Sequence, residues 1–370
     1  MSDRPPNQIT SQQASALLDC SVQHIRHLIR QGRISGSRFG RDWAIDEPSV
    51  REYQRSAYVR PKQEIARVAE AQVSLAFTTP ELEAVTNVAS VPQRSPFRYP
   101  GGKTWLVPVV RSWLKARSSA SSVLVEPFAG GAIVGLTAVM ESLVSSVELA
   151  ELDEDIAAVW SVVLSGQAKA LCKLILDFPC NEPNVCDLLQ TVPASKLEHA
   201  FQTIVRNRVS RGGILAPGAG LVKHGEAGRG MASRWYPETL VKRIQEISRH
   251  KGRIHFHHGD GIELLESLSS DPNVLIFADP PYTIAGRRLY RHHHIDHERL
   301  FKALGKTKAS FLATYDDNTY ILGLAQKFGF SAARVPMKST HHLRKYELLI
   351  SRELAWHVSG SEAPLIAVET

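Results

Sequence analysis

The sequence predicts a mostly parallel α/β domain that follows a small, separate unit at the N-terminus. From residue 95 onward, short apolar runs typical of buried strands alternate with segments of helical periodicity. The runs that begin at residues 123, 147, 253 and 274 are each followed by glycine or acidic residues. Because ligands bind beyond the carboxyl ends of strands in open α/β sheets, these strand ends are the candidate sites.

The N-terminal unit is predicted over residues 8–56, as two short helices followed by two short strands. Ser11 is expected to cap the first helix, and Gly32 is well placed to end the second. The two strands are expected at residues 33–38 and 43–45, joined by a tight turn. Two helices and a hairpin are a common plan for small binding domains.

This pattern resembles the winged helix-turn-helix of excisionase and MerR-type DNA-binding domains. The resemblance implies that the second helix lies in the major groove of DNA, with Arg26 and Arg30 among its exposed residues. The turn that carries Arg38 and Arg41 would then contact the DNA backbone. The same pattern also fits a three-helix interaction module with a basic, solvent-facing surface.

The tetrapeptide Asp279-Pro280-Pro281-Tyr282 follows the apolar run at residues 274–278 and is the strongest candidate for a site of chemistry. Asp279 can accept a hydrogen bond, and the rigid prolines leave a carbonyl oxygen free to accept a second. The ring of Tyr282 offers a stacking surface. Two acceptors beside a stacking surface fit the exocyclic amino group of a nucleobase.

Two glycine turns precede this tetrapeptide in the sequence. The first opens a helix with a lysine, so that backbone N–H groups and one positive charge can meet an anion or a carboxylate. The second joins a strand to a helix at residues 133–140, and its glycines would let a cofactor approach the backbone closely. The candidate ligands in the two turns are Tyr99, Gly101, Gly102, Lys103, Phe128, Gly130 and Gly131.

Two further strand ends supply carboxylates. Asp153 lies about 20 residues beyond the second glycine turn, the distance at which a carboxylate reaches ribose hydroxyls in Rossmann-like folds. Its neighbour Glu151 could take the same role. Asp260 ends the strand that begins at residue 253 and could accept the amine of an adenine ring.

The motifs resemble those of the DNA adenine N6-methyltransferases of the Dam (D12) class, which use S-adenosylmethionine. Their order along the chain is that of the α group of this family. The residues RYPGGK resemble the opening glycine motif of the family, EPFAGGA its motif I, ELD its acidic motif II, and DPPY its catalytic motif. Tyr99 stands where relatives commonly have tryptophan, and Ala132 where many have another glycine. The resemblance covers residues 95–352, including further similar segments at residues 289–290, 296–300, 311–316 and 346–350.

The resemblance implies a Rossmann-like S-adenosylmethionine-dependent methyltransferase sheet with an inserted, mainly helical target-recognition domain. Asp279, Pro280, Pro281 and Tyr282 would act on an adenine flipped out of double-stranded DNA, without a metal, and Asp279 would also border the cofactor. The expected division is a helix-turn-helix domain at 1–58, a linker at 59–94, a catalytic domain at 95–153 and 253–356, the insertion at 154–252, and a C-terminal tail at 357–370.

The expected insertion carries a basic, glycine-rich stretch. Arginine side chains there can read guanine edges or clamp phosphates. The candidates for DNA binding are Arg206, Arg208, Arg211, Lys223, Arg229 and Arg234.

The composition of the chain indicates which binding partners and which cellular location to expect. A net charge of +7 favours an anionic partner, with nucleic acid first. The four cysteines match no zinc spacing, and no signal peptide or membrane span is recognisable. We therefore expect a cytoplasmic, nucleoid-associated protein of a prokaryote or phage, for which a cognate restriction endonuclease is one conceivable partner.

Two alternatives stay open at the level of sequence. Cytosine also offers an exocyclic amine, so N4-cytosine methylation is the nearer one, although the aspartate of the tetrapeptide favours adenine by resemblance. The other is a DNA-binding regulator with an inactive methylase domain. The intact set of Lys103, Asp153 and Asp279 argues against this second alternative.

Overall fold

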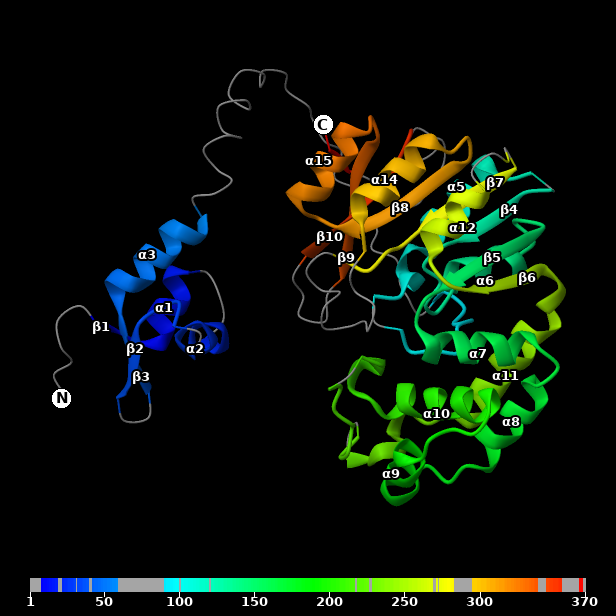
Figure 1. Cartoon of the computed structure of the whole chain (residues 1–370), viewed down its shortest axis with the longest axis horizontal. Coiled ribbons are helices and arrows are strands. Elements are labelled where there is room, and N and C mark those ends of the chain that lie inside the picture. The colour runs from blue at the N-terminus through cyan, green and yellow to red at the C-terminus, as the bar shows by residue number, and fades with distance from the viewer. Residues whose placement is uncertain are drawn as a thin grey trace. The chain divides into compact units, whose positions relative to one another are not determined.

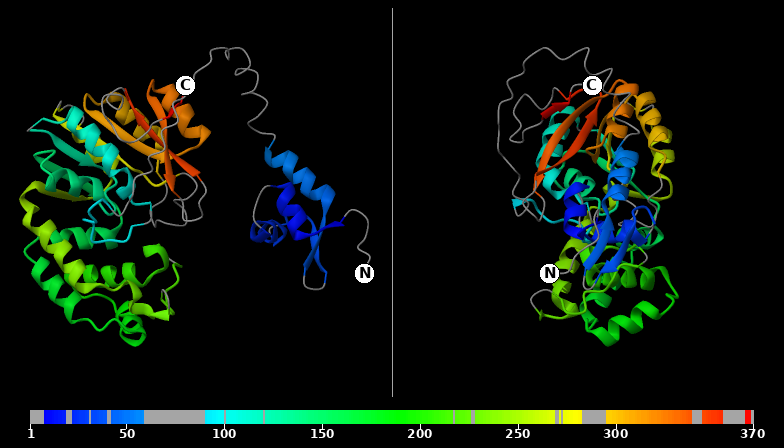
Figure 2. Two further views of the ribbon diagram at one scale, coloured as in Figure 1. Left: turned by 180° about the vertical axis from the view of Figure 1, so that it is seen from behind. Right: turned by 90° about the vertical axis from the view of Figure 1, so that its left-hand side faces the viewer.

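The computed structural model divides the chain into two compact units, Met1–Thr79 and Pro80–Thr370. Both units are drawn in Figures 1 and 2, and each has a hydrophobic core of its own. The structure describes residues 8–18, 22–30, 32–39, 42–58, 90–99, 101–119, 121–216, 218–225, 228–268, 271, 273–282, 295–338, 344–354 and 366–368.

The N-terminal unit packs three helices against a small antiparallel sheet with the strand order β1-β3-β2. Its core is formed by apolar residues that include Ile25, Ile45 and Val50, all fully buried. The elements are β1 (Gln8–Ile9), α1 (Ser11–Leu17), α2 (Val22–Arg30), β2 (Gly36–Phe39), β3 (Asp42–Asp46) and α3 (Glu47–Tyr58). The predicted helices and hairpin are thus present, and β1 and α3 are additions to the prediction.

Thr10, and not Ser11 as expected, caps α1. The Thr10 hydroxyl accepts a bond from the N–H of Gln13 at 3.1 Å, and the Gln13 side chain accepts one from the N–H of Thr10 at 2.8 Å. This reciprocal capping box needs a glutamine three residues after the cap, which Thr10 has. Gly32 ends α2 as predicted, in the left-handed region at φ 67°.

The second unit is built on a mostly parallel, Rossmann-like sheet, which confirms the predicted α/β class. In the described residues the strand order is β11-β9-β10-β8-β7-β4-β5-β6. Strands β4 to β8 run parallel, while β10 is antiparallel to both β8 and β9. The strands are β4 (Val123–Glu126), β5 (Ser146–Glu151), β6 (Ile254–His258), β7 (Val274–Ala278), β8 (Ser310–Asp316), β9 (Ser331–Lys338), β10 (Arg344–Ser351) and β11 (Ile366–Val368).

Helices cover both faces of this sheet. On one face the core joins α5 (Val107–Arg117), α6 (Ile133–Met140) and α7 (Glu154–Leu164) to alternate strand residues such as Leu124 and Phe277. On the other face, α12 (Gly261–Leu268), α14 (His297–Lys306) and α15 (Thr319–Lys327) pack on Val125 and Ile276. All residues of β7 are buried, as expected of a central parallel strand.

The insertion is helical, and Figure 1 shows it gathered beyond α7 at one end of the sheet. It contains α8 (Ala168–Asp177), α9 (Glu182–Gln190), α10 (Lys196–Val209) and α11 (Pro237–Arg249), with short 3-10 turns η3 (Arg211–Gly213) and η5 (Met231–Arg234). Helix α7, which follows the expected boundary at residue 153, packs on β5 and β6 as well as on α10. Trp160, on α7, is fully buried and contacts the Phe97 ring at a centroid distance of 6.1 Å.

Residues near two other expected boundaries also have contacts within the second unit. The end of the predicted linker belongs to the second unit, because Val91 is buried in its core and Arg94 pairs with Glu141 at 2.9 Å. Residues 59–89 lie outside the described residues. Within the expected C-terminal tail, β11 pairs antiparallel with β9, with Ile366 opposite Arg334.

The described residues contain neither a single membrane-spanning helix nor a metal-binding group. No single helix there has both the length and the apolar composition to cross a membrane, although α7 and α8, bent by 111° at their break, have them as a pair. Nor do the described parts of the chain contain a group of three or more histidine, cysteine, aspartate or glutamate residues that could hold a metal ion.

Candidate active site

A cavity of about 630 Å³ lies where the strand order reverses, a size typical of small-molecule sites. The reversal falls between β4 and β7, because β5 and β6 continue from one side of β4 while β7 and β8 lie on the other. Ligands of doubly wound sheets bind at such a switch point. Four successive strand ends line the cavity, through Pro127, Glu151, Asp260 and Asp279.

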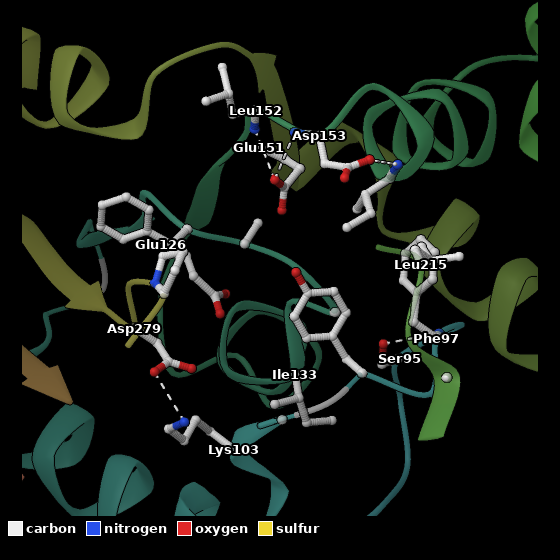
Figure 3. Close-up of a pocket in the computed structure, with 18 of the residues that line it drawn as sticks. Ser95, Phe97, Lys103, Glu126, Ile133, Glu151, Leu152, Asp153, Leu215 and Asp279 are labelled. Carbon is white, nitrogen blue, oxygen red and sulfur yellow. Dashed lines mark hydrogen bonds and ion pairs between the residues drawn. The ribbon is translucent and has the colours of Figure 1, made fainter. Parts of the chain in front are cut away.

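The structure brings most of the predicted ligands to this cavity. Figure 3 shows Glu126, Lys103 and Asp279 on one side of it and Glu151 and Asp153 on another. The predicted residues that line it are Tyr99, Gly102, Lys103, Phe128, Gly131, Asp153, Asp260, Asp279 and Pro281. Gly101, Gly130, Pro280 and Tyr282 are adjacent in sequence to lining residues but do not themselves line it.

The loop after β4 leaves no room for side chains at its glycines. A Cβ atom on Gly130 would lie 2.6 Å from the Tyr99 ring, and one on Gly131 would lie 2.8 Å from the Ser95 hydroxyl. Gly130 also has φ 45°, in the left-handed region, and its carbonyl accepts a bond from the Trp160 indole at 2.9 Å. The loop therefore presents bare backbone beside the cavity, as a closely bound ligand requires.

Glu151, more than Asp153, is positioned as the carboxylate at the end of β5. Asp153 caps α7 and accepts bonds from the N–H groups of Asp155 and Ile156. Glu151 belongs to the strand itself and accepts a bond from the N–H of Gly130 at 2.9 Å. Both line the cavity, so the role that the sequence assigned first to Asp153 has two structural candidates.

Asp260 already has partners for both carboxylate oxygens. One accepts a bond from the N–H of Ile262 at 2.8 Å, at the start of α12. The other pairs with Arg299 at 2.9 Å. Because each carboxylate oxygen can accept more than one bond, Asp260 retains capacity for a further donor in the cavity.

Lys103, Asp279, Glu347 and Tyr282 form a compact network beside the cavity. The Lys103 ammonium lies 3.1 Å from Asp279 and 3.5 Å from Glu347, and it donates to the carbonyl of Gly101 at 2.8 Å. The Tyr282 hydroxyl donates to Glu347 at 2.8 Å. One ammonium thus lies within 3.5 Å of two carboxyl groups beside the cavity.

Two neighbours lie against the Tyr282 ring. The Lys103 ammonium is 4.9 Å from the ring centroid, and the Tyr315 ring is stacked at 6.4 Å with an interplanar angle of 25°. Tyr315 is fully buried in the core, so this contact ties the Tyr282 ring to the core of the second unit.

Burial and neighbouring charges have opposite effects on the pKa values of Lys103 and Glu347. Burial lowers the pKa of Lys103, but Asp279 and Glu347 outweigh this effect and raise it above its ordinary value. Burial raises the pKa of Glu347, and the Lys103 ammonium only partly offsets that rise. Lys103 is therefore charged at neutral pH.

Glu126, at the end of β4, is a buried carboxyl group that also lines the cavity. It is 3% exposed and accepts a bond from the N–H of Gly135 at 2.8 Å. Burial raises its pKa to about 8, and the nearby charge of Asp279 adds to the rise. Burial likewise raises the pKa of Glu151 to about 7.

The predicted DNA-binding residues of the insertion separate into exposed and buried groups. Arg211 and Arg229 are exposed, and Lys223 is exposed but paired with Glu182 at 3.1 Å. Arg206 is half-buried and reaches Asp155 of α7 at 3.3 Å, so it joins α10 to α7. Arg234 is half-buried and lines the cavity.

Arg208 differs from the prediction of a solvent-facing arginine. It is 6% exposed, lines the cavity, and donates to the carbonyl of Pro96 at 2.6 Å. Burial lowers its pKa to about 9, and the charges of Arg243 and Arg98 lower it further. The repeated glycine and arginine content of the stretch could not distinguish this inward-facing arginine from the exposed ones.

In the N-terminal unit, α2 presents only part of its predicted DNA-binding set to solvent. Arg30 is exposed, whereas Arg26 is half-buried and its buried Nε atom has no hydrogen-bond partner among the described residues. Arg38 of β2 is exposed, and Arg41 lies outside the described residues.

Comparison with known proteins assigns the N-terminal unit. A model of the helix-turn-helix domain family matches residues 9–58. The chain has a helix-turn-helix domain at its N-terminus. A search of curated proteins gave no match.

Solved structures with a similar fold include several methyltransferases. An rRNA methyltransferase from Streptomyces viridochromogenes is 12% identical, with 69% of this chain and 87% of that chain covered and a TM-score of 0.34. A precorrin-6y C5,15-methyltransferase from Geobacter metallireducens is 10% identical, with coverages of 66% and 86% and a TM-score of 0.29. A protein described as an RNA methyltransferase, from Pyrococcus horikoshii, is 10% identical, with coverages of 79% and 100% and a TM-score of 0.33.

Several residues of the site were not singled out from the sequence. Glu126 lies within a quoted motif, and its position at the end of an apolar strand was the available signal. Glu347 lies within the similar segment at residues 346–350, directly before the apolar residues of β10. Thr314 and Asn207 carry no comparable signal, because their roles depend on partners 35 and 109 residues away in the chain.

Proposed function

We propose that this protein is a site-specific DNA methyltransferase that transfers a methyl group from S-adenosylmethionine to N6 of adenine in double-stranded DNA. The observation that carries the proposal is that a candidate amine-binding site and a candidate cofactor-binding site lie in one cavity. The carboxylate of Asp279, at the end of β7, shares a cavity with the bare glycine loop after β4. One side can receive an amine and the other a nucleotide-like cofactor.

The residues present fit that cofactor. The glycine loop would meet it at Gly131, which lines the cavity and has no side chain to hold the cofactor away from the backbone. Glu151 and Asp153 would face ribose hydroxyls, and Asp260 would face the adenine amine. When bound, S-adenosylmethionine supplies a methyl group on a sulfonium from which it leaves readily.

The chain's own residues would then position the amine. The lone pair of an adenine amino group is delocalised into the ring, so the nitrogen is a poor nucleophile until its hydrogens are bonded. Asp279 and the carbonyl of Pro280 would accept those two hydrogens, and Tyr282 would support the ring after Lys103 moves aside. Positioning and electrostatics of this kind supply most of the rate enhancement in direct group transfer.

The proposal that DNA is the substrate is supported by the net charge of the chain and by the basic residues of the insertion. The chain has a net charge of +7, and the exposed Arg211, Lys223 and Arg229 lie in the insertion. Since a base within a duplex cannot reach a cavity, the target adenine would be flipped out of the helix. Arg208 and Arg234, which line the cavity, would lie near the flipped nucleotide.

The decisive experiment is methyl transfer by the full chain in cells that lack other DNA methylases. Long-read sequencing would report the modified base and its sequence context. We expect N6-methyladenine for the wild type, none for Asp279→Ala, and full activity for Asp187→Asn, an exposed aspartate on α9. Methylation by Asp279→Ala would contradict the proposal, and N4-methylcytosine would identify cytosine as the target.

A second function, regulation by DNA binding, is favoured by the helix-turn-helix domain at residues 9–58. We expect deletion of residues 1–58 to abolish binding to an operator and to spare methylation. A gel shift with and without S-adenosylmethionine, beside the methyl-transfer assay, separates the two activities. Loss of both activities in the truncated protein would count against a separate regulatory role.

A further inference from the structure

Asp279 is held through one of its two carboxylate oxygens. The hydroxyl of Thr314 donates to Oδ1 at 2.7 Å, and the Lys103 ammonium lies 3.1 Å from the same atom. Among the described residues, none makes a hydrogen bond or an ion pair with Oδ2. The carboxylate therefore has one occupied oxygen and one that can receive a new donor.

Thr314 is built into the sheet as a fixed donor. It lies on β8, is fully buried, and is paired in register with Leu349 of β10. Residues of one strand alternate between faces, so Thr314 shares its face with Leu312, on the side of the sheet where α5 packs. A β-branched side chain on a buried strand has little rotational freedom, which holds the hydroxyl in place.

Lys103 cannot fix the carboxylate in the same way. Its ammonium is a point charge on a flexible stem and can follow either oxygen. It also lies 4.9 Å from the centre of the Tyr282 ring, in the place that a stacked base would take. If a base enters and displaces the Lys103 ammonium, the hydrogen bond from Thr314 to Oδ1 can remain in place.

We propose that Thr314 is a positioning residue for Asp279, whose buried hydroxyl holds Oδ1 so that Oδ2 is presented to the amino group in the cavity. This inference rests on the proposed function. The terminal torsion of an aspartate side chain is broad, so an unanchored carboxylate would sample many orientations. Because transfer needs a near-attack geometry, a rotated acceptor would slow the chemical step more than binding.

The test compares four variants of the full chain in a methyl-transfer assay on duplex DNA. Thr314→Val and Thr314→Ala remove the hydroxyl, Thr314→Ser keeps it, and Thr203→Val is a control at a buried threonine of α10. We expect kcat to fall about tenfold or more in the first two, with KM for DNA and Kd for S-adenosylmethionine within about twofold of wild type. Thr314→Ser and Thr203→Val should stay within about threefold of the wild-type kcat.

Each outcome bears on the inference. A Thr314→Val protein as fast as wild type overturns it and leaves the role of Asp279 standing. A wild-type protein without methyl transfer overturns the inference together with the proposed function. If Thr314→Val fails to fold in a thermal unfolding control, the pair Thr314→Ala and Thr314→Ser decides, since both lose the methyl group and only one loses the hydroxyl. Equal kcat values for that pair would overturn the inference.

Discussion

Ala132 is, with Ser142, one of the described non-glycine residues whose backbone lies in the left-handed region. It precedes α6 with φ 47° and ψ 35°, in the left-handed region, and it is 1% exposed. For a residue with a Cβ atom, this conformation costs about 1–2 kcal/mol. The strain lies at the end of the glycine loop, next to the cavity, where the helix must begin abruptly.

We predict that Ala132→Gly changes the free energy of unfolding by less than about 1 kcal/mol. Relief of roughly 1–2 kcal/mol of backbone strain is offset by about 0.8 kcal/mol for the lost buried methyl group and by the entropy of glycine. Ala138→Gly is the matched control, since Ala138 is equally buried but lies within α6. That change should cost about 2 kcal/mol, from helix propensity and the same methyl group.

Urea denaturation of the two variants beside wild type measures the difference. If Ala132→Gly were as destabilising as Ala138→Gly, the left-handed conformation at residue 132 would be contradicted.

Glu126 makes the stability of the second unit depend on pH. Its pKa is raised by burial to about 8, above the ordinary value of 4.5, so the folded state holds a proton that the unfolded state has released. The stability it contributes is complete below pH 4.5 and is lost as pH rises through about 8. Each unit of such a shift corresponds to about 1.4 kcal/mol, so the loss amounts to several kcal/mol.

We predict that Glu126→Gln reduces the fall in unfolding free energy between pH 5 and pH 8, roughly the range between the two pKa values. Glutamine keeps an oxygen that can accept from Gly135 but carries no titrating proton. Urea denaturation at several pH values provides the measurement. Glu263→Gln, an exposed position on α12, should keep the wild-type pH profile, and an unchanged slope for Glu126→Gln would refute the prediction.

At the level of elements, α10 and α11 hold the first glycine turn in place. The Asn207 side chain accepts from the N–H of Arg98 at 2.9 Å and donates to the carbonyls of Arg98 and Gly213 at 3.0 and 2.8 Å. Arg208 donates to the carbonyl of Pro96, and Arg243 to that of Ser95. The insertion therefore orders the segment that leads to Lys103, besides any contact with DNA.

We predict that Asn207→Ala destabilises the second unit by about 2 kcal/mol or more, because one buried and two half-buried backbone groups lose their partner, at about 1–3 kcal/mol for a fully buried group. Hydrogen exchange should speed up in peptides that cover residues 95–106. Asn184→Ala is the control, since its amide makes only an exposed bond to Pro179, and it should cost less than about 1 kcal/mol. Unchanged exchange near residue 98 in Asn207→Ala would contradict this role.

At the level of the whole molecule, the two units have separate cores. The N-terminal core gathers apolar residues of α1, α2, β3 and α3, and no residue of it is shared with the core of the sheet. Ile45 lies at its centre and is fully buried. Substitutions in this core should act on the helix-turn-helix domain and leave the larger unit unaffected.

We predict that Ile45→Ala costs the N-terminal unit about 2–5 kcal/mol, from the lost burial and the cavity left behind. Ile45→Val should cost about 0.5–1.5 kcal/mol at the same position. Calorimetry would follow the transitions of both units, and a methyl-transfer assay would follow the larger one. A matching loss of stability in the second unit would contradict the independence of the two cores.

Much of the fold could be predicted from the sequence because it depends on local patterns. The run at residues 274–278 coincides with β7 and the helical run at residues 133–140 with α6, since apolar periodicity is a property of neighbouring residues. The place of the site was predictable for a similar reason. Parallel strands end at one edge of a sheet, so Asp260 and Asp279 were expected at the same edge, and both line the cavity there.

Contacts between distant segments could not be predicted in this way. The burial of Arg208, the network of Lys103 with Glu347, and the choice between Glu151 and Asp153 all depend on how separate elements pack. The sequence by itself determined the parallel sheet, the helix-turn-helix unit and the strand ends that carry the polar residues. Only the tertiary structure decided which of those residues meet, because a hydrogen bond such as that of Thr314 to Asp279 joins strands whose relative register is set by the whole sheet.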